Sequence, residues 1–269
     1  MVRRFIHKTL ERISKVFILD EIERRLDRID ANLLDLKTLS LQVNKQEFMV
    51  KTEHRFAFKS QDFINPKGSK NDFTRSPAFV GDVNRIFGRS VSYLDIGCAN
   101  GGLVNDFLIQ GNTAIGIEGS DFGLLTKQDH WKVIPQYLFN ADVTKPFRVL
   151  RDSQLFKFDV IGAWEVLEHI SESDLPAFLQ NVRDHLDETS IFMASIAQFS
   201  DFDPVTGKEW HVTIKPKEWW YDLFIQCGLK PLEVPRNFAF PRGTGNSTVW
   251  DWDTKVNPNS GFHVFLKQI

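Results

Sequence analysis

The stretch Tyr93–Gly102, YLDIGCANGG, constrains the fold more than any other part of this chain. Its first residues are apolar around a single carboxylate, Asp95, which predicts a short buried strand. Three glycines follow (Gly97, Gly101 and Gly102), and the amphipathic segment Leu103–Gln110 comes next. Glycine tolerates positive φ and close backbone approach, so such a turn can present main-chain N–H groups to a ligand at a helix N-terminus. The stretch therefore predicts a strand–turn–helix unit that carries a ligand site.

Strands and helices alternate from Ser92 onward. The expected strands are Tyr93–Ile96, Thr113–Glu118, Tyr137–Ala141, Phe158–Trp164 and Ile191–Ala197. The expected helices are Ala78–Phe87, Leu103–Gln110, Phe122–His130, Leu175–Leu186 and Lys217–Cys227. Alternation of this kind indicates a parallel sheet with helices on both faces. After Gly228, Pro231–Phe240 and Gly261–Ile269 predict two final strands around a polar loop. We expect an α/β fold: a doubly wound, mostly parallel seven-stranded sheet with a C-terminal antiparallel hairpin.

The N-terminal part of the chain has a different pattern. Residues 5–45 contain neither proline nor glycine, and the apolar residues from Ile22 to Val43 recur at alternating steps of four and three. This heptad spacing predicts a long helix in a coiled coil, and hence a homo-oligomer. The alternatives are a helix packed on its own domain and, less favoured, a helix lying on an anionic membrane surface. We expect a helical segment at 1–56, a polar linker at 57–76 and the α/β domain at 77–269.

Composition excludes several classes of function. The net charge of −2 provides no general attraction to nucleic acid. The two cysteines, Cys98 and Cys227, are not in C-x-x-C spacing, which argues against a disulfide scaffold or a cysteine-rich zinc site. No apolar run reaches membrane-spanning length, and the N-terminus has no signal-type apolar core. We expect a cytoplasmic protein with no nucleic-acid partner and no metal.

Polar residues follow three further strands. Glu118 ends the second strand, Asp142 follows the third, and the fourth runs into AWEVLEHI, which contains Glu165, Glu168 and His169. In open α/β sheets ligands bind at the carboxyl ends of the strands. A carboxylate at the end of the second strand is suited to accept hydrogen bonds from ribose hydroxyls. The four strand ends therefore predict one nucleotide-binding edge.

The motifs DIGCANG, IEGSD, ADV and WEVLEHI resemble the Rossmann-fold (class I) S-adenosylmethionine-dependent methyltransferases over about residues 77–269. The resemblance is greatest to the branch that acts on small molecules, quinones and sugars, and implies S-adenosyl-L-methionine as cofactor. It implies that the glycine turn holds the methionine end, the carboxylate after strand two the ribose, and the Asp after strand three the adenine. The cofactor-binding residues carried over are Asp95, Gly97, Cys98, Ala99, Gly101, Glu118, Gly119, Asp142, Val143 and Trp164.

Two departures narrow the interpretation. Position 99 is alanine, so the turn lacks the dinucleotide pattern G-x-G-x-x-G and an NAD-dependent oxidoreductase becomes a distant second. The motif N/D-P-P-Y/F of enzymes that methylate amino groups of DNA bases is absent, and AWEV stands in its place. The resemblance therefore points away from nucleobases.

Two histidines are candidates for the catalytic base. A hydroxyl acceptor must lose its proton as it attacks the methyl group, and histidine suits this role near neutral pH. His169 follows strand four, whereas His211 stands in the loop after strand five, beside Lys208 and Glu209. We favour His211 slightly, although either residue could instead be structural. Glu165 and Glu168 are candidates to orient the acceptor or, less favoured, to hold a divalent cation.

Aromatic residues gather in the late loops. Trp210, Trp250 and Trp252 are predicted to contact the acceptor, because rings and carboxylates in a polar loop suit stacking on a sugar. The same residues would suit a lid or an edge strand. We expect O-methylation of a hydroxyl on a sugar or surface glycan. The alternatives are a quinone or natural-product O-methyltransferase and a cofactor-binding scaffold that acts through its coiled coil without catalysis. RNA or protein methylation has only the excess of basic residues in 1–60 in its favour.

Overall fold

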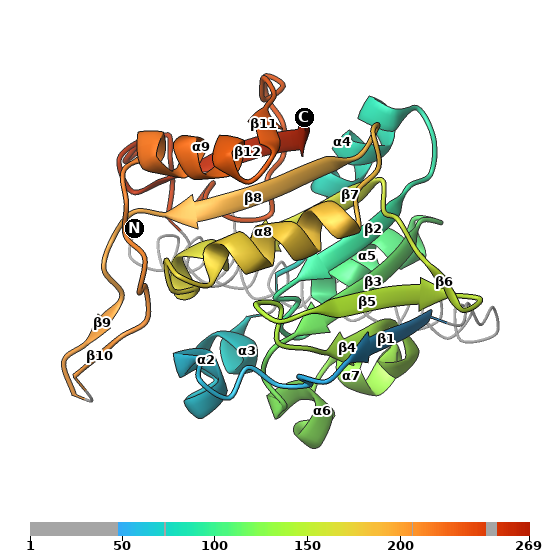
Figure 1. Ribbon diagram of the computed structural model, residues 1–269, viewed down its shortest axis with the longest axis horizontal. Coiled ribbons are helices and arrows are strands. Elements are labelled where there is room, and N and C mark those ends of the chain that lie inside the picture. Colours follow the sequence, from blue (N-terminus) through green and yellow to red (C-terminus); the bar gives the residue numbers. More distant parts are fainter. Residues whose placement is uncertain (1–47, 73, 206, 246–251) are drawn as a thin grey trace, which may run out of the picture. The chain divides into compact units, whose positions relative to one another are not determined.

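Seven strands form the central sheet in the order β11–β12–β8–β7–β2–β3–β4 (Figure 1). The computed structural model describes residues 48–72, 74–205, 207–245 and 252–269. The predicted N-terminal helix lies outside these residues. The strands of the sheet are β2 (Ser92–Ile96), β3 (Thr113–Glu118), β4 (Leu138–Asn140), β7 (Val160–Trp164), β8 (Ile191–Ala197), β11 (Leu229–Pro231) and β12 (Gly261–Gln268).

Apolar runs place the central strands inside the protein. Every residue of β7 is buried, and so is every residue of β8 after Ile191. Strands buried on both faces are typical of parallel sheets covered by helices. Leu94 of β2 lies between Ile115 of β3 and Ile161 of β7, both in parallel register. Of these seven strands, β12 runs opposite to the others and pairs antiparallel with both of its neighbours, β8 and β11. The predicted α/β fold, with a largely parallel seven-stranded sheet and a C-terminal antiparallel pair, is confirmed.

Helices cover both faces of the sheet. The helices α4 (Pro77–Phe87) and α5 (Gly102–Ile109) lie on one face, and α8 (Leu175–Asp184) and α9 (Lys217–Gln226) on the other (Figure 1). Proline at the first position and the left-handed Gly88 after the last turn fix the bounds of α4. The shorter helical elements between α5 and α8 are α6 (Phe122–Thr126), α7 (His130–Val133) and the 3₁₀ turns Pro135–Tyr137 and Leu167–His169. None of the described helices combines the length and the apolar character that crossing a bilayer would need.

Two predicted elements are wrong in extent. The helix expected over Phe122–His130 is divided into α6 and α7, because Lys127 and Asp129 adopt positive φ and interrupt the helical path. The strand expected over Pro231–Phe240 stops at Pro231. Pro235 lacks a backbone N–H, and Asn237 has a φ of 58°, so the chain cannot continue as a paired strand.

A second, three-stranded sheet has no counterpart in the sequence prediction. It consists of β1 (Phe48–Thr52), β5 (Phe147–Arg151) and β6 (Gln154–Leu155), and β1 pairs antiparallel with β5. Between β1 and α4 the chain forms two short helices, α2 (Gln61–Ile64) and α3 (Lys67–Asn71). We call residues 53–76 the cover segment; Phe73 within it is outside the described residues. After β8 comes a two-stranded hairpin, β9 (Phe202–Asp203) and β10 (Lys208–Glu209).

Candidate functional site

The glycine turn begins where β2 ends and leads directly into α5. Gly97 has a φ of 72°, and its N–H donates to the carbonyl of Ile117 on β3 at 2.8 Å. A Cβ at Gly97 would lie 2.5 Å from Cγ2 of Val166, so the turn after β7 leaves no room for a side chain. Only glycine satisfies both the backbone angle and this contact. The predicted turn is thus held against the two neighbouring strands.

Ala99 is the residue that departs from the dinucleotide pattern, and it too adopts a positive φ, 45°. Its N–H donates to Oε2 of Glu118 at 2.9 Å, and its carbonyl accepts from Nε1 of Trp131 at 2.8 Å. An L-residue in the left-handed region is strained, and here two hydrogen bonds hold it in place.

Asp95 is a buried carboxylate at the end of β2. The hydroxyl of Tyr93 donates to its Oδ1 at 2.9 Å, and Nε1 of Trp164 donates to the same Tyr93 oxygen at 2.9 Å. Burial raises the pKa of Asp95 to about 8; the hydrogen bond from Tyr93 opposes this shift, and the negative charges of Asp72 and Glu118 add to it. A cation bound beside Asp95 would relieve this destabilised charge.

Glu118 ends β3 and is tied to the backbone on both sides. Ala99 donates to Oε2 and Ser120 to Oε1, each N–H at 2.9 Å. Burial raises the pKa of this carboxyl, while these two hydrogen bonds act in the opposite direction. The side chain of Ser69 on α3 also hydrogen-bonds to this carboxylate, so one of its lone pairs remains for a hydroxyl of a ligand.

The residues predicted around the adenine lie beneath the cover segment. The carbonyl of Gly119 accepts from Ala57 at 3.0 Å, and the N–H of Asp142 donates to the carbonyl of His54 at 2.8 Å. The Asp142 carboxylate accepts from the N–H of Thr144 at 3.0 Å. The carbonyl of Val143 accepts from Nδ2 of Asn181 on α8 at 2.9 Å. The cover segment therefore binds to the ends of both β3 and β4.

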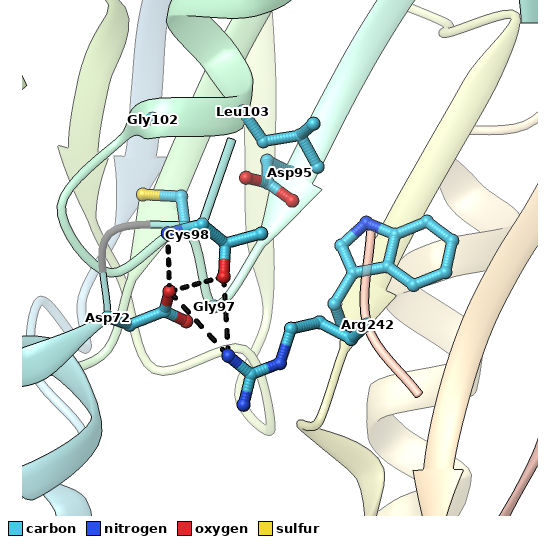
Figure 2. A pocket seen from close by; sticks show the side chains of 9 residues that line it. Asp72, Asp95, Gly97, Cys98, Gly102, Leu103 and Arg242 are labelled. Carbon is cyan, nitrogen blue, oxygen red and sulfur yellow. Dashed lines mark hydrogen bonds and ion pairs between the residues drawn. The ribbon is translucent and has the colours of Figure 1, made fainter. Parts of the chain in front are cut away.

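A small cavity lies beside the glycine turn. It is lined by Asp72, Thr74, Asp95, Gly97, Cys98, Gly102, Leu103, Trp164 and Arg242. Figure 2 shows Asp72 and Arg242 pointing toward one another beside Asp95. Arg242 Nη1 lies 3.9 Å from Asp72 Oδ1 and donates to Thr74 Oγ1 at 3.3 Å. Two carboxylates and one guanidinium fit a ligand that carries both a cationic and an anionic group.

The turn after β7 brings Glu165 to this edge with a φ of 58°. Its Oε1 accepts from the hydroxyl of Ser195 at 2.9 Å, and its Oε2 accepts from Nε1 of Trp252 at 2.6 Å. Burial raises the pKa of Glu165, and the hydrogen bond from Trp252 and the charge of Arg242 oppose that shift. The structure therefore brings together two predicted residues, Glu165 and Trp252, whose positions differ by 87 in the sequence.

Trp252 is fixed by its surroundings. Its ring stacks on His263, with centroids 5.8 Å apart, and a Cβ at Gly261 would lie 2.4 Å from it. The indole N–H is occupied by Glu165. Trp250 lies outside the described residues, and Trp210 is only 2% exposed, with Nζ of Lys67 at 5.8 Å from its ring centroid. Of the predicted acceptor tryptophans, Trp210 is thus buried and Trp252 is engaged by Glu165.

Glu168 and His169 follow in the same turn. Glu168 is 0% exposed; its Oε1 accepts from the N–H of Ala197 at 2.7 Å, and within the described part of the chain its Oε2 has no hydrogen-bond partner. Burial, with the charge of Glu165, raises its pKa to about 8. His169 Nδ1 lies 3.0 Å from Oδ2 of Asp62. Burial alone would lower the pKa of His169, but Asp62 and then Glu168 and Glu165 outweigh it and raise it to about 9.

The two candidate bases are neighbours. The rings of His169 and His211 meet edge to face, with centroids 4.9 Å apart. Nδ1 of His211 lies 2.6 Å from the carbonyl oxygen of Phe199. A carbonyl only accepts, so Nδ1 carries the hydrogen and Nε2 of the neutral ring keeps its lone pair. Burial and the positive charge of His169 both lower the pKa of His211. The pair thus consists of one protonated and one neutral imidazole.

Four residues of this site were missed by sequence reasoning: Asp62, Asp72, Ser195 and Arg242. The first two come from the polar stretch interpreted as a linker, and Arg242 from the loop after β11. Arg242 and Thr74 differ by 168 in sequence position, so no local spacing could have paired them. The described residues contain no group of three or more His, Cys, Asp or Glu side chains arranged to hold a metal ion.

Comparison with known proteins points to methyltransferases, both by sequence and by fold. Residues 44–231 match the family described as a methyltransferase domain. The fold is similar to an S-adenosylmethionine-dependent methyltransferase from Clostridium acetobutylicum, with 14% identity, a TM-score of 0.50, and coverage of 77% of this chain and 95% of that one. It is also similar to the CcbJ methyltransferase from Streptomyces caelestis, with 11% identity, a TM-score of 0.50, and coverage of 81% and 99%.

A third structure, the glycopeptide N-methyltransferase MtfA in complex with S-adenosylmethionine, is 15% identical and has a TM-score of 0.47. The match covers 74% of this chain and 96% of that one. No curated protein matches the sequence. At these identities the Clostridium acetobutylicum and Streptomyces caelestis structures establish a shared fold.

Proposed function

This chain belongs to the methyltransferase-domain family, and we propose that it methylates a hydroxyl group on a sugar or surface glycan. It is a methyltransferase whose cofactor is S-adenosylmethionine. When bound, this cofactor supplies an electrophilic methyl group on a positively charged sulfonium. The observation that carries the hydroxyl proposal is the contact of His211 Nδ1 with the carbonyl of Phe199, which leaves Nε2 as the proton acceptor, next to the His169 ring.

The donor side of the site consists of the glycine turn and the carboxylates around it. Asp95 and Asp72 suit the ammonium and sulfonium of the methionine end, and Arg242 suits its carboxylate. Glu118 is assigned to the ribose, because its carboxylate stands at the end of β3 with a lone pair that remains for a hydroxyl. Asp142, with Val143 and Gly119, is assigned to the adenine side. The backbone of Cys98 and the indole of Trp164 complete the wall.

His211 is the proposed general base. The acceptor hydroxyl gives its proton to Nε2 while its oxygen attacks the methyl group, and alignment supplies much of the remaining rate enhancement. His169 is unsuited to this role near neutral pH, because its raised pKa, about 9, keeps it protonated. Two groups whose surroundings move their pKa values apart are the usual sign of an acid–base assignment.

The two glutamates are proposed to orient the acceptor. Glu165 is held by Ser195 and Trp252, and its oxygens stand beside Arg242 at the donor cavity. Glu168 accepts from the backbone N–H of Ala197, and its carboxylate, when ionised, raises the pKa of His169. Trp252 acts on the acceptor through Glu165. The sugar assignment is supported by this density of polar groups, and a direct role of Trp210 and Trp250 stays a prediction.

A second candidate is a phenolic or quinol acceptor. Phe199 and Val212 flank His211 and are 38% and 49% exposed. The Phe199 ring meets the His211 ring with centroids 5.0 Å apart, so an acceptor that reaches Nε2 would meet apolar surface. This observation favours an acceptor with a flat apolar body.

The test combines binding and transfer. Calorimetry first measures binding of S-adenosylmethionine; a labelled methyl group is then followed into sugars, nucleotide sugars and polysaccharide fragments, into phenols and quinols, and into amines. We expect a methyl ether on a sugar. A phenol-only product would replace the first candidate by the second, and an amine-only product would overturn both. Binding without transfer to any hydroxyl would favour the non-catalytic scaffold.

Self-association through residues 5–45 remains a proposal from the heptad pattern alone. A stalk that joins several active sites would raise the effective concentration on a polymeric acceptor. Light scattering before and after removal of residues 1–44 tests it. A lower mass of the assembly is expected after the deletion, and an unchanged mass would contradict the proposal.

A further inference from the structure

Besides Asp72 and Thr74 at its end, three parts of the cover segment contact the site. Its first part binds the strand ends through the carbonyl of His54 and the N–H of Ala57. Asp62 on α2 meets His169, and Lys67 on α3 meets Asp201 next to the β9–β10 hairpin at 3.2 Å. The first contact is on the donor side and the other two are on the acceptor side. Asp62 is the one that reaches the histidine pair.

We propose that Asp62 is a positioning residue of the methyl-transfer site, which holds the His169 imidazole in its protonated form and so keeps His211 available as the base. This inference rests on the proposed function, because it needs His211 to act as that base. It adds a residue from outside the strand ends and places it on the cover segment.

Local structure fixes the carboxylate. The hydroxyl of Ser60 caps α2 by accepting from the N–H of Asp62 at 3.1 Å. The Asp62 and His169 side chains are 27% and 20% exposed, so their ion pair is only partly screened by water. Nδ1 of His169 and Oδ2 of Asp62 are within ion-pair distance, but their contact does not have the geometry of a hydrogen bond. The contact is therefore electrostatic, and it favours the charged form of the imidazole.

The charges around the pair favour the same arrangement. His169 faces Asp62 from α2, Glu168 and Glu165 from its own turn, and His211 from the loop after β10. His211 faces His169, with Asp201, Glu209 and the more distant Asp62 as the acidic groups nearby. Burial alone would raise the pKa of Asp62, but His169 outweighs it and lowers it. Because His169 touches His211 directly, its charge dominates over that of Asp62 at His211.

The same segment also reaches the donor cavity. Asp72 and Thr74 line that cavity, and the carbonyl of Asp72 accepts from Nδ2 of Asn100 in the glycine turn at 2.9 Å. A cover segment that is bound over the donor therefore also presents Asp62 to His169.

The first test needs no acceptor. The pKa values of His169 and His211 are read from the Cε1–H resonances in NMR titrations, assigned with His169→Gln and His211→Gln. In Asp62→Asn, which keeps the side-chain shape, less opposes the effect of burial on His169. We therefore expect its pKa to fall by at least about two units, into the range where His211 titrates, and the His211 pKa to rise. Asp62→Glu should restore both toward the native values. Lys67→Met, which removes another ion pair of the cover segment, is the matched control and should leave the His169 pKa unchanged.

An unchanged His169 pKa in Asp62→Asn would overturn the proposal. An equal fall of the His169 pKa in Lys67→Met would overturn it as well, because the cover segment as a whole, and not the carboxylate, would then be responsible. These outcomes are independent of whether His211 is the base.

The second test uses the pH dependence of kcat with the acceptor found by labelled transfer. In Asp62→Asn the acidic limb should move to higher pH, because His211 then holds its proton more tightly, and Asp62→Glu should move it back. A limb that stays in place despite the NMR shift would show that Asp62 does not act on the reaction.

Discussion

The two halves of the ligand-binding edge are built in different ways. The donor half, from Tyr93 to Val143, is held by contacts between adjacent strands and their turns, such as Ala99 to Glu118. The acceptor half is assembled from the cover segment, the turn after β7, the loop after β10 and the loop after β11. Its defining contacts join residues such as Trp252 and Glu165, at a separation of 87, or Lys67 and Asp201, at 134.

The cofactor is thus bound mainly by residues that the sheet positions, whereas the acceptor side depends on loops and on the cover segment. The donor half needs mainly one strand–turn–helix unit and the two strands beside it, which the sheet itself positions, and Asp72, Thr74 and Arg242 complete it from outside that unit. The acceptor half depends on loops and on the cover segment, and loops tolerate change far better than buried strands. Substitutions in one half should therefore leave the chemistry of the other half intact.

Among the substitutions, His211→Gln is expected to give the largest difference between its effect on kcat and its effect on cofactor affinity. Loss of a general base lowers kcat by roughly 10²–10⁴-fold. The affinity for S-adenosylmethionine, measured by calorimetry, should stay within a factor of about two, because His211 is not in the donor half. The exposed His54 provides the control His54→Gln. A matching loss of cofactor affinity in His211→Gln would break the comparison.

The converse change is Glu118→Gln. One of the two backbone N–H groups that donate to Glu118 would then face an amide NH₂, which cannot accept its hydrogen bond. A ribose hydroxyl would also lose a charged acceptor. Hydrogen bonds to charged groups contribute roughly 1.5–3 kcal/mol, so the dissociation constant of the cofactor should rise by about 10–100-fold. The histidine pKa values should not move. Glu172→Gln, at an exposed ion pair with Lys215, is the control and should leave the affinity unchanged.

Cofactor binding should also release a proton from the donor half. Asp95, with a pKa of about 8, is mostly protonated at pH 7, and a bound sulfonium and ammonium stabilise its ionised form. Affinity should therefore rise with pH up to about 8, by at most about tenfold per pH unit. Calorimetry at pH 7 in two buffers with different ionisation enthalpies measures this proton. Its persistence in Asp95→Asn would assign the release to another group.

The smallest effect concerns the strained residue of the donor half. Ala99→Gly removes a left-handed L-residue, which costs about 1–2 kcal/mol, but makes the unfolded chain more flexible. The free energy of unfolding, measured by denaturant titration, should rise by less than about 1 kcal/mol. Ala78→Gly, in an exposed turn of α4, should lower it by about 0.5–1 kcal/mol. If the free energy of unfolding fell in both variants, Ala99 would be shown to be unstrained.

The donor half was accessible from sequence because its signals are local. Strand alternation, glycine spacing and the carboxylates after β2 and β3 predicted the sheet and the placement of Asp95 and Glu118 at one edge. Boundaries failed where single residues control the backbone, as Lys127 and Asp129 do between α6 and α7. The heptads of residues 5–45 remain a prediction, since they lie outside the described residues.

The acceptor half was only partly accessible. His169 and His211 could be named as chemical candidates, but their edge-to-face contact comes from the folding of the loop after β10 over the turn after β7. Asp62 lies in a polar stretch with all the marks of a linker, and its partner is set by tertiary structure alone. Trp252 stands in a loop whose composition suits a sugar, yet its indole N–H is used by Glu165.

The antiparallel pairing of β1 with β5 limits how this protein can be shortened for expression. A truncated version that starts at Pro77 would lose β1 together with Asp62 and Asp72. It would also leave β5 with an open edge, in which Phe147 and Val149 are buried in the intact protein. Unpaired apolar strand edges recruit other chains. A version that starts at Lys45 keeps β1 and should stay in solution, whereas the shorter one should aggregate.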